Sequence, residues 1–426
     1  MNALLRVPYA LAGAVAQGLA YMIPDGGSKL QRGLVARRGI LTRYRRWAST
    51  SRDPSRPLVW FHAPSVGEGL QALPVIQLLR SRRPDVQIVY THYSPSASDF
   101  ARSTGADFSD YLPFDTFDAA SAAISALRPT VLVFSKLDVW PALTETAGRR
   151  NVKIGVISAT LPEASARRNV FARHVLDDAY RALDRVGAIS DDDADRLRQQ
   201  GVRAGRVSVT GDTRYDQVWA RAHAPTPPLV QSLRSSSPTV VAGSTWPADE
   251  EELLPAWIQL KKKLPRTRLI IAPHELSDGH LRNIVSWATL NELKITRLSG
   301  SGARESDVIL VDRYGVLGDI YALADIAYVG GGFHAAGLHS VLEPAAYGAP
   351  VLFGPRHAKS REASALLASG GAHAVNDREE IARRLEDLLG STNARDAAGA
   401  AARAVVERGL GAAERSYQLV TELLGR

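Results

Sequence analysis

Short apolar runs alternate with longer stretches of helical periodicity over most of the chain. The runs are nearly continuous in valine, leucine and isoleucine, which is typical of parallel strands buried on both faces. In the first half they are PLVWFHAP, VQIVYTHY, TVLVFSK, VKIGVISA, RVGAIS and RVSVTG, and in the second half TVVAGST, RLIIAP, KITRLS, DVILVDR, IAYVGG and PVLFGP. Between them, stretches such as GLQALPVIQLLRSRR have the spacing of amphipathic helices. The alternation predicts an α/β protein with two doubly wound, Rossmann-like halves.

The boundaries of the two halves follow from local composition. Residues 224–238 are rich in proline and serine, separate the two series of strands and predict a linker. We therefore expect an N-terminal Rossmann-like domain over residues 45–223 and a C-terminal one over residues 239–426, with a central cleft at the carboxyl ends of their strands. The length of 426 residues agrees, because it exceeds what one ordinary core organises. The helical last stretch could pack back across the first domain.

Residues 1–44 predict a membrane-associating segment. Ala3 to Pro24 is apolar and close to the roughly 20 residues that span a bilayer, but Arg6 and Pro8 make it a poor spanning helix. The basic residues that follow, up to residue 52, have no acid among them: Lys29, Arg32, Arg37, Arg38, Arg43, Arg45, Arg46 and Arg52. An apolar segment beside a basic cluster is typical of an interfacial anchor on an anionic membrane. A secretion signal and an ordinary solvated basic face are the alternatives.

The overall composition narrows the class of protein. Hydrophobic residues make up 45% and charged residues 23% of the chain, as in a folded globular protein. The sequence contains no cysteine, which excludes disulfides and cysteine metal sites. The net charge of +8 suits an anionic partner. A membrane is favoured over nucleic acid, because an apolar segment adjoins the basic cluster and the aromatic–basic pattern of RNA-binding proteins is missing.

Polar loops follow the predicted strands of the first half, and ligands of open α/β sheets bind in such loops. Gly67 permits a tight turn that leaves Glu68 at the start of a helix, although a helix cap explains this acid nearly as well. Asp138 follows another strand, and an acid in that position costs solvation unless it is paired or functional. Asp212 and Arg214 close the first half.

The second half offers a second set of such loops. Pro273 and His274 follow one strand, Gly315 marks a turn, and the triple glycine 330–332 would let a ligand approach backbone amides. Glu343 is the single acid of an apolar stretch, where a helix-start charge is the simplest explanation. The glycines match neither a P-loop nor a dinucleotide-binding motif. Together, these loops predict a nucleotide-binding cleft.

Taken in order, these motifs resemble a divergent branch of the Kdo transferases of lipopolysaccharide synthesis. The motifs are S-V-G-E, S-P-S, L-D-V-W-P, G-D-T-R-Y-D, G-S-T-W, A-P-H-E, G-L-H-S-V-L-E-P and G-A-P-V-L-F-G-P. The resemblance implies a GT-B fold and an inverting transfer of 3-deoxy-D-manno-octulosonic acid (Kdo) from CMP-Kdo to the lipid A precursor, lipid IVA. It also implies that no metal or other cofactor takes part. The expected location is the cytoplasmic face of the inner membrane of a Gram-negative bacterium, on its anionic surface.

The resemblance assigns roles residue by residue. Glu68 matches the catalytic base, while Asp138 and Arg214 match a glutamate and a lysine that stabilise the transition state. The positions that match CMP contacts are Pro273, His274, Gly315, Val316, Leu317, Ser340, Val341, Leu342 and Glu343, the last on the ribose hydroxyls. The sequence departs from the family at several of them: Val316 replaces a glutamate, Ser340 replaces an asparagine, and an arginine next to His274 is missing.

Two other functions fit the same sequence. One is a different GT-B enzyme that uses a UDP-sugar, either a transferase or an epimerase. The other is a relative without turnover that binds a nucleotide or a lipid, which the departures at positions 138, 214, 316 and 340 keep open. The identity of the bound nucleotide separates the first alternative from a Kdo transferase.

Overall fold

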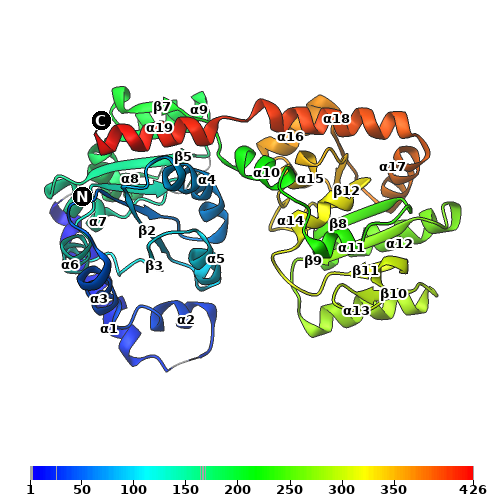
Figure 1. The fold of residues 1–426 in the computed structure, drawn as a ribbon, viewed down its shortest axis with the longest axis horizontal. Helices are drawn as coiled ribbons and strands as arrows, with labels where there is room; N and C mark the ends of the chain where they lie inside the picture. Colours follow the sequence, from blue (N-terminus) through cyan, green and yellow to red (C-terminus); the bar gives the residue numbers. More distant parts are fainter. Residues whose placement is uncertain (1–2, 25, 164, 166, 168, 426) are drawn as a thin grey trace. The chain divides into compact units, whose positions relative to one another are not determined.

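The computed structural model describes residues 3–24, 26–163, 165, 167 and 169–425 (Figure 1). It divides into two units, of which unit 1 comprises Met1–Gln217 and Leu410–Arg426 and unit 2 comprises Val218–Gly409. The stretch expected as a linker, residues 224–238, lies inside unit 2 and contains helix α11 (Pro228–Ser232). It is ordered there because Val230 and Leu233 bury their side chains in the core of that unit.

Unit 1 is built on one seven-stranded sheet with the order β3-β2-β1-β4-β5-β6-β7, and every neighbouring pair is parallel. Its strands are β1 (Leu58–His62), β2 (Gln87–His92), β3 (Phe108–Tyr111), β4 (Val131–Ser135), β5 (Lys153–Ala159), β6 (Arg185–Ala188) and β7 (Val207–Val209). The residues of β1, β2 and β4 are all buried, as their continuous apolar runs predict. The edge strand β3 is only half-buried and carries a serine and an aspartate.

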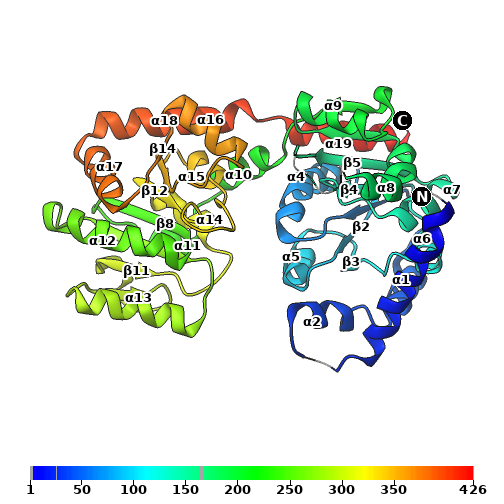
Figure 2. The same cartoon turned by 180° about the vertical axis from the view of Figure 1, so that it is seen from behind.

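Helices cover both faces of this sheet. The helices of unit 1 are α1 (Ala3–Met22), α2 (Lys29–Val35), α3 (Ile40–Ser51), α4 (Val66–Arg82), α5 (Ser98–Ser103), α6 (Phe117–Leu127), α7 (Pro141–Arg149), α8 (Val170–Ala182) and α9 (Asp191–Gln199), and α10 (Arg214–Ala222) continues from unit 1 into unit 2. Figure 2 shows α1 beside α6, and residues of α1, α3 and α6 line a common groove of about 770 Å³. None of the helices in the described part of the chain combines the length and hydropathy needed to cross a bilayer.

The final helix, α19 (Ala412–Leu424), returns to unit 1 and packs against α4 and β5 (Figure 1). Leu419 and Leu423 are buried in the same cluster as the α4 side chains. The close approach of α19 to the sheet requires glycine at position 155, because a Cβ there would lie 2.7 Å from Leu423 Cδ1. The carboxylate of Asp216 accepts hydrogen bonds from the amides of Gly411 and Ala413, at 2.8 and 2.9 Å, and so caps the start of α19.

Unit 2 repeats the architecture with a second parallel sheet of seven strands, in the order β10-β11-β9-β8-β12-β13-β14. Its strands are β8 (Thr239–Thr245), β9 (Arg268–Pro273), β10 (Ile295–Arg297), β11 (Val308–Leu310), β12 (Ile326–Val329), β13 (Val351–Phe353) and β14 (Ala372–Ala374). Its helices include α12 (Pro247–Lys263), α13 (Asp278–Leu290), α14 (Leu317–Ile320), α15 (Leu342–Ala346), α16 (Arg361–Ser369), α17 (Arg378–Gly390) and α18 (Thr392–Arg408). The predicted α/β class with two Rossmann-like halves is confirmed.

Candidate functional site

In unit 1 the order of the strands reverses between β1 and β4. Strands β2 and β3 lie on one side of this point and β5 to β7 on the other. Ligands of open α/β sheets bind at the carboxyl ends of the strands beside such a point. The chain leaves β1 for the helix that carries Glu68, and it leaves β4 for the loop that carries Asp138. Two of the three residues predicted to be catalytic therefore lie in the loops that flank the reversal.

Glu68 lies in the first turn of α4, and its carboxylate is held by two donors. Ser65 Oγ donates to one oxygen, and Lys136 Nζ lies 3.2 Å from the other. Burial alone would raise the pKa of the Glu68 carboxyl, but the Ser65 hydrogen bond and the charge of Lys136 outweigh it, and the pKa is lowered. The side chain keeps 18% of its surface exposed, so an ionised carboxylate remains open to solvent and to substrate.

Lys136, the partner of Glu68, was not singled out by the sequence analysis. It directly follows β4 and has a backbone φ of 62°, in the left-handed region that residues other than glycine rarely adopt. Its neighbour Ser135 donates to the backbone carbonyl of Glu68 at 2.8 Å. The loop after β4 thus fixes both the backbone and the side chain of Glu68. The local sequence offers no signal for this pairing, because Lys136 reads there as an ordinary basic residue after a buried strand.

Asp138 follows in the same loop and is surrounded by donors. Its Oδ1 accepts from Arg167 at 3.1 Å, and its Oδ2 accepts from Trp140 Nε1 at 3.1 Å and faces His62 Nε2 at 3.6 Å. Burial raises the pKa of Asp138, but His62, Arg167 and Trp140 together bring it below its ordinary value. Tyr93 stacks on Trp140 with ring centroids 5.3 Å apart. Asp138 is therefore an ionised and tightly positioned carboxylate.

Arg214 begins α10 and is held by an acid two residues earlier. Its Nε and one terminal nitrogen donate to Asp212 Oδ2 at 2.9 and 2.6 Å, and Gln71 donates to Asp212 Oδ1 at 3.2 Å. Burial raises the pKa of Asp212, but the charge and the hydrogen bonds of Arg214, together with the hydrogen bond from Gln71, bring it below its ordinary value. Gln71 lies one turn after Glu68 on α4, so one helix connects the surroundings of Arg214 with those of Glu68. Asp138 lies in the same loop as Lys136, which contacts Glu68. The three residues predicted to be catalytic are therefore connected through α4 and this loop.

In unit 2 the strand order reverses between β8 and β12, and a cluster of aromatic rings lies in the adjoining loops. Trp246 stacks on His334 with centroids 4.1 Å apart and on His274 with centroids 4.4 Å apart. Its Nε1 donates to His339 Nε2 at 3.0 Å. Burial and the neighbouring His274 lower the pKa of His339 to about 4, so this ring is neutral at physiological pH. The cluster holds His274, a predicted CMP contact, in a fixed orientation.

A buried acid that the sequence analysis missed shapes the glycine loop beside this cluster. Asp249, on α12, accepts from the amide of Gly331 at 2.7 Å and from the amide of Phe333 at 3.1 Å. Its side chain is fully buried. The triple glycine is therefore tied to the start of α12, with Gly331 at a φ of 91° that favours glycine.

Glu343 lies near the turn predicted to contact CMP. It is in the first turn of α15, and the charges that act on it are those of Arg221 and Asp319, which pair with each other at 2.9 Å. Asp319 belongs to α14, which begins directly after the Gly315–Val316 turn. Burial is the main cause that raises the pKa of Glu343 above its ordinary value. Its carboxylate accepts no hydrogen bond from the described residues, so it is available to a ligand.

The other predicted CMP contacts differ in what they can offer. Val341 and Leu342 are 1% exposed, and Pro273 is buried at the end of β9, so these residues present only backbone atoms to a ligand. Val316 and Leu317 pack against the core of unit 2. The exposed residues among the predicted contacts are Gly315 and Ser340.

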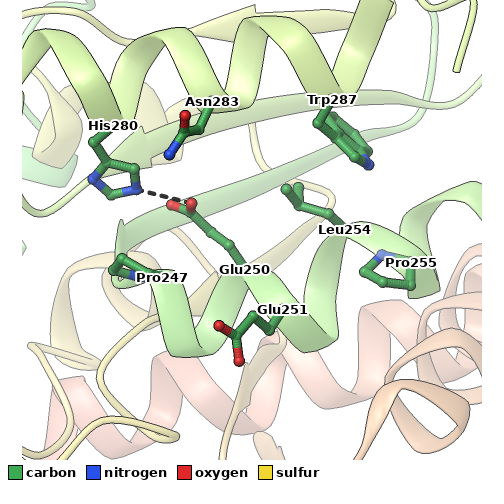
Figure 3. Close-up of a pocket in the computed structure, with 8 residues that line it drawn as sticks. All are labelled: Pro247, Glu250, Glu251, Leu254, Pro255, His280, Asn283 and Trp287. Atoms are coloured by element: carbon green, nitrogen blue, oxygen red, sulfur yellow. Dashed lines mark hydrogen bonds and ion pairs between the residues drawn. The ribbon is translucent and has the colours of Figure 1, made fainter. Parts of the chain in front are cut away.

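A further pocket in unit 2, of about 420 Å³, lies between α12 and α13 (Figure 3). On its wall His280 Nε2 lies 2.8 Å from a carboxylate oxygen of Glu250, and Thr245 donates to the same glutamate at 2.7 Å. Trp287 and Leu254 line its apolar end. The pocket contains none of the residues predicted to contact CMP.

The structure separates the basic residues of the N-terminal stretch into two groups. Arg37 is 2% exposed and donates to the carbonyls of Leu112 and Tyr93, at 3.0 and 3.1 Å. Arg38 donates to the carbonyl of Ala20 at 2.7 Å, and Arg43 forms a bidentate pair with Asp110. The expectation that these three arginines face lipid phosphates is therefore wrong, because their donors are used inside unit 1. The exposed basic residues are Lys29, Arg32, Arg45 and Arg46.

Helix α1 has one face on unit 1 and another in solvent. Tyr9 donates to Asp115 at 2.6 Å, and Arg6 pairs with Glu145 at 3.3 Å and lies over the ring of Phe117. The exposed apolar side chains of the helix recur at helical spacing, and they are Val7, Leu11, Val15, Leu19, Tyr21 and Met22. The helix therefore presents an apolar stripe to its surroundings.

Comparisons with known proteins point to one class of enzyme. A family model described as 3-deoxy-D-manno-octulosonic-acid transferase (Kdo transferase) matches residues 37–217. The chain is 26% identical over 400 residues to a 3-deoxy-D-manno-octulosonic acid transferase of Haemophilus influenzae, covering 92% of each chain. It is 28% identical to one of Chlamydia trachomatis, covering 86% of this chain and 85% of that protein.

Among solved structures, the UDP-GlcNAc 2-epimerase from Neisseria meningitidis, bound to UDP-GlcNAc, is similar with a TM-score of 0.62. It is 14% identical and covers 87% of this chain and 99% of that chain, a likeness that shows the fold alone. The two Rossmann-like units have the fold of this epimerase, and the matches to Kdo transferases indicate a glycosyltransferase. The resemblance to the Kdo transferases, predicted from the sequence, is confirmed over most of the chain.

Proposed function

We propose that the protein is an inverting glycosyltransferase that moves Kdo from CMP-Kdo to the lipid A precursor in lipopolysaccharide synthesis. The observation that carries the proposal is the position of Glu68, an ionised and partly exposed carboxylate at the strand-order reversal of a Kdo transferase relative. A general base must be ionised and within reach of the hydroxyl whose proton it accepts. Hydrogen bonds from Ser65 and Lys136 favour the ionised form of Glu68, and the partial exposure of its side chain supports access to an acceptor hydroxyl.

In the proposed reaction, Glu68 accepts the proton of an acceptor hydroxyl while that oxygen bonds to the anomeric carbon of Kdo. The bond from this carbon to the phosphate oxygen of CMP breaks, and CMP leaves with the electron pair. The anomeric carbon gains positive charge in the transition state, which the ionised carboxylate of Asp138 stabilises. Arg214, held rigidly by Asp212, stabilises the negative charge that develops on the departing phosphate. No step uses a metal or another cofactor.

The donor is proposed to bind to unit 2 with its ribose on Glu343. This carboxylate lies beside the Gly315 turn and makes no hydrogen bond to the described residues, so both of its oxygens can accept from ribose hydroxyls. The His274 ring, stacked on Trp246, and the glycine loop tied to Asp249 adjoin the strand-order reversal of the same unit. In the proposed complex these groups take over from the glutamate and asparagine side chains that positions 316 and 340 lack.

The acceptor is a lipid, so the protein is proposed to work at the cytoplasmic face of the inner membrane. The apolar stripe of α1, which includes Val7, Leu11 and Met22, would enter the interface between headgroups and acyl chains. Arg45 and Arg46 have no ion-pair partner among the described residues and would meet lipid phosphates. Arg37, Arg38 and Arg43 take no part in this contact.

The test of the proposed function is transfer by wild-type protein and by Glu68→Gln, with CMP-Kdo generated in the assay and lipid IVA as acceptor. Glutamine keeps one acceptor oxygen for Ser65 or Lys136 but cannot take a proton, so we expect a folded protein whose kcat falls by roughly 10²- to 10⁴-fold. Asp99→Asn, which changes an exposed first-turn acid of α5, is the matched control. Near wild-type turnover by Glu68→Gln would show that Glu68 is not the base and only caps the start of α4.

Calorimetry with free nucleotides separates the proposal from a UDP-sugar enzyme of the same fold. We expect CMP to bind to the full-length protein and UDP to bind much more weakly. Preferential binding of UDP, together with no transfer of Kdo by the wild-type protein, contradicts the proposed function.

A further inference from the structure

Two exposed basic residues, Arg356 and Lys359, lie in the loop of unit 2 that leads from β13 to α16. Neither side chain forms a hydrogen bond or an ion pair with the described residues. The loop begins at the carboxyl end of β13, which pairs with β12, one of the two strands at the strand-order reversal. Ligands of open α/β sheets bind beside such strand ends. The two cations are therefore on the edge of the sheet that is proposed to hold the donor.

Backbone contacts fix this basic loop against the triple glycine. The amide of Arg356 donates to the carbonyl of Gly332 at 2.9 Å. A Cβ at position 332 would lie 2.3 Å from the backbone nitrogen of Gly354, so the approach leaves no room for a side chain there. The two loops therefore pack backbone against backbone, and this contact sets the position of Arg356 beside the glycine loop.

The glycine loop in turn adjoins the proposed ribose site. The amide of His339 donates to the carbonyl of Gly330 at 3.1 Å, and His339 directly precedes the segment from Ser340 to Glu343. One series of backbone contacts thus joins the basic loop, the glycine loop and the start of α15. The phosphate and the sugar of a donor whose ribose is bound by Glu343 would lie next to these loops.

The basic loop is also held by contacts of its own. The amide of Ser360 donates to the carbonyl of His357 at 2.8 Å, which closes a turn around Lys359. The ring of His357 packs on Phe353, the last residue of β13, with ring centroids 5.3 Å apart. Ser360 Oγ then accepts from the amide of Ala363 at 3.1 Å and caps α16. Because the backbone is already fixed, a ligand that binds to this loop has little ordering of the chain to oppose it.

The proposed donor carries two anionic groups, the phosphate of CMP and the carboxylate of Kdo. The phosphate is assigned above to Arg214, so the carboxylate is the anion that still lacks a partner. A planar guanidinium offers a carboxylate two parallel N–H donors, whereas an ammonium acts as a point charge. We propose that Arg356 binds the carboxylate of the transferred sugar and that Lys359 adds positive charge beside it. This role rests on the proposed function and extends it, because the two residues would select an acidic sugar over a neutral one.

The test compares CMP-Kdo with CMP, because only CMP-Kdo carries the carboxylate. In Arg356→Gln we expect the KM for CMP-Kdo to rise roughly tenfold or more, since a charge-assisted contact is lost. The affinity for CMP should equal that of the wild type, both in calorimetry and as the Ki of CMP in the transfer assay. Arg356→Lys keeps the charge without the two parallel donors, so its KM should fall between the two. Lys359→Gln should raise the KM less than Arg356→Gln.

Lys262→Gln is the matched control, because it removes an exposed positive charge of the same unit, in the last turn of α12, and should change neither quantity. A wild-type KM for CMP-Kdo in Arg356→Gln overturns the assignment. An equal loss of affinity for CMP and CMP-Kdo overturns it as well, because the arginine would then bind the phosphate. Both of these results leave Kdo transfer by the wild type in place. Absence of that transfer refutes the proposed function, and the role of Arg356 with it.

Discussion

Arg37 is the residue at which a folding role and a membrane role predict opposite results. Its guanidinium is 2% exposed and lies 3.9 Å from the ring centroid of Tyr93. It donates to the carbonyls of Leu112, Tyr93 and Gly33, which come from separate parts of unit 1. Arg37→Met keeps most of the length of the side chain and removes both the charge and the donors. The variant leaves buried carbonyls without partners.

The expected loss of stability in Arg37→Met follows from these contacts. A hydrogen bond to a charged group contributes about 1.5–3 kcal/mol, and a desolvated cation–π contact about 2 kcal/mol. Removal of the buried charge returns several kcal/mol of desolvation, so the contributions do not simply add. The net loss is expected at about 1–3 kcal/mol, the cost of leaving a buried acceptor unsatisfied. For a unit of roughly 150–250 residues this lowers the Tm by about 2–12 °C.

The assay is thermal unfolding followed by tryptophan fluorescence or calorimetry, with flotation of the same samples on anionic vesicles. Arg46→Met is the matched control, because Arg46 is exposed and its substitution should change stability by less than about 0.5 kcal/mol. A Tm of Arg37→Met equal to that of the control would refute the reasoning. If vesicle binding is lost while the Tm is unchanged, Arg37 belongs to the membrane contact after all.

Three further predictions test the other parts of the molecule. Glu343→Ala should weaken CMP binding by roughly tenfold or more in calorimetry, as two charge-assisted hydrogen bonds are lost; because burial raises the pKa of Glu343, wild-type affinity should also fall as the pH drops toward that raised pKa. Replacing Arg45 and Arg46 by glutamate should release the protein from anionic vesicles and raise the KM for the lipid acceptor, with CMP affinity unchanged; flotation equal to wild type rejects the docking role. Lys136→Met should shift the acid limb of the kcat profile to higher pH, because the positive charge that lowers the pKa of Glu68 is removed, and an unmoved limb would show that Ser65 alone sets it.

Most of the strands could be predicted because they are buried on both faces and read as continuous apolar runs. The two strands that the pattern did not predict, β3 and β14, are the outermost strands on one side of each sheet. The residues of β3 are only half-buried and include Ser109 and Asp110, while β14 is the short sequence Ala-His-Ala. An edge strand has one neighbour and is less buried, so selection for apolar side chains is weaker there.

The candidate catalytic residues could be predicted for a different reason. Glu68, Asp138 and Arg214 each follow a recognisable strand, and the fold class alone places such loops on the ligand-binding edge of the sheet. Their partners could not be predicted. His62 reads as one more residue of a buried strand, yet it faces an acid 76 positions later in the chain, and Lys136 reads as an ordinary loop cation. Such pairings arise from strand order and register, which local sequence does not specify.

Side-chain pairings that local sequence does not specify also affect the prediction of function. The basic stretch is an example, because its arginines look alike in the sequence but have different roles. With Arg37, Arg38 and Arg43 committed to contacts inside unit 1, the exposed basic residues are Lys29, Arg32, Arg45 and Arg46. At about 1 kcal/mol each on an anionic surface, they supply only weak attraction. In the proposed docking, stable attachment requires a second signal, which the apolar stripe of α1 would supply by burying side chains at roughly 0.8 kcal/mol per methylene group. Membrane attachment should therefore depend on both features together, and neutral vesicles should retain only the weak apolar part of it.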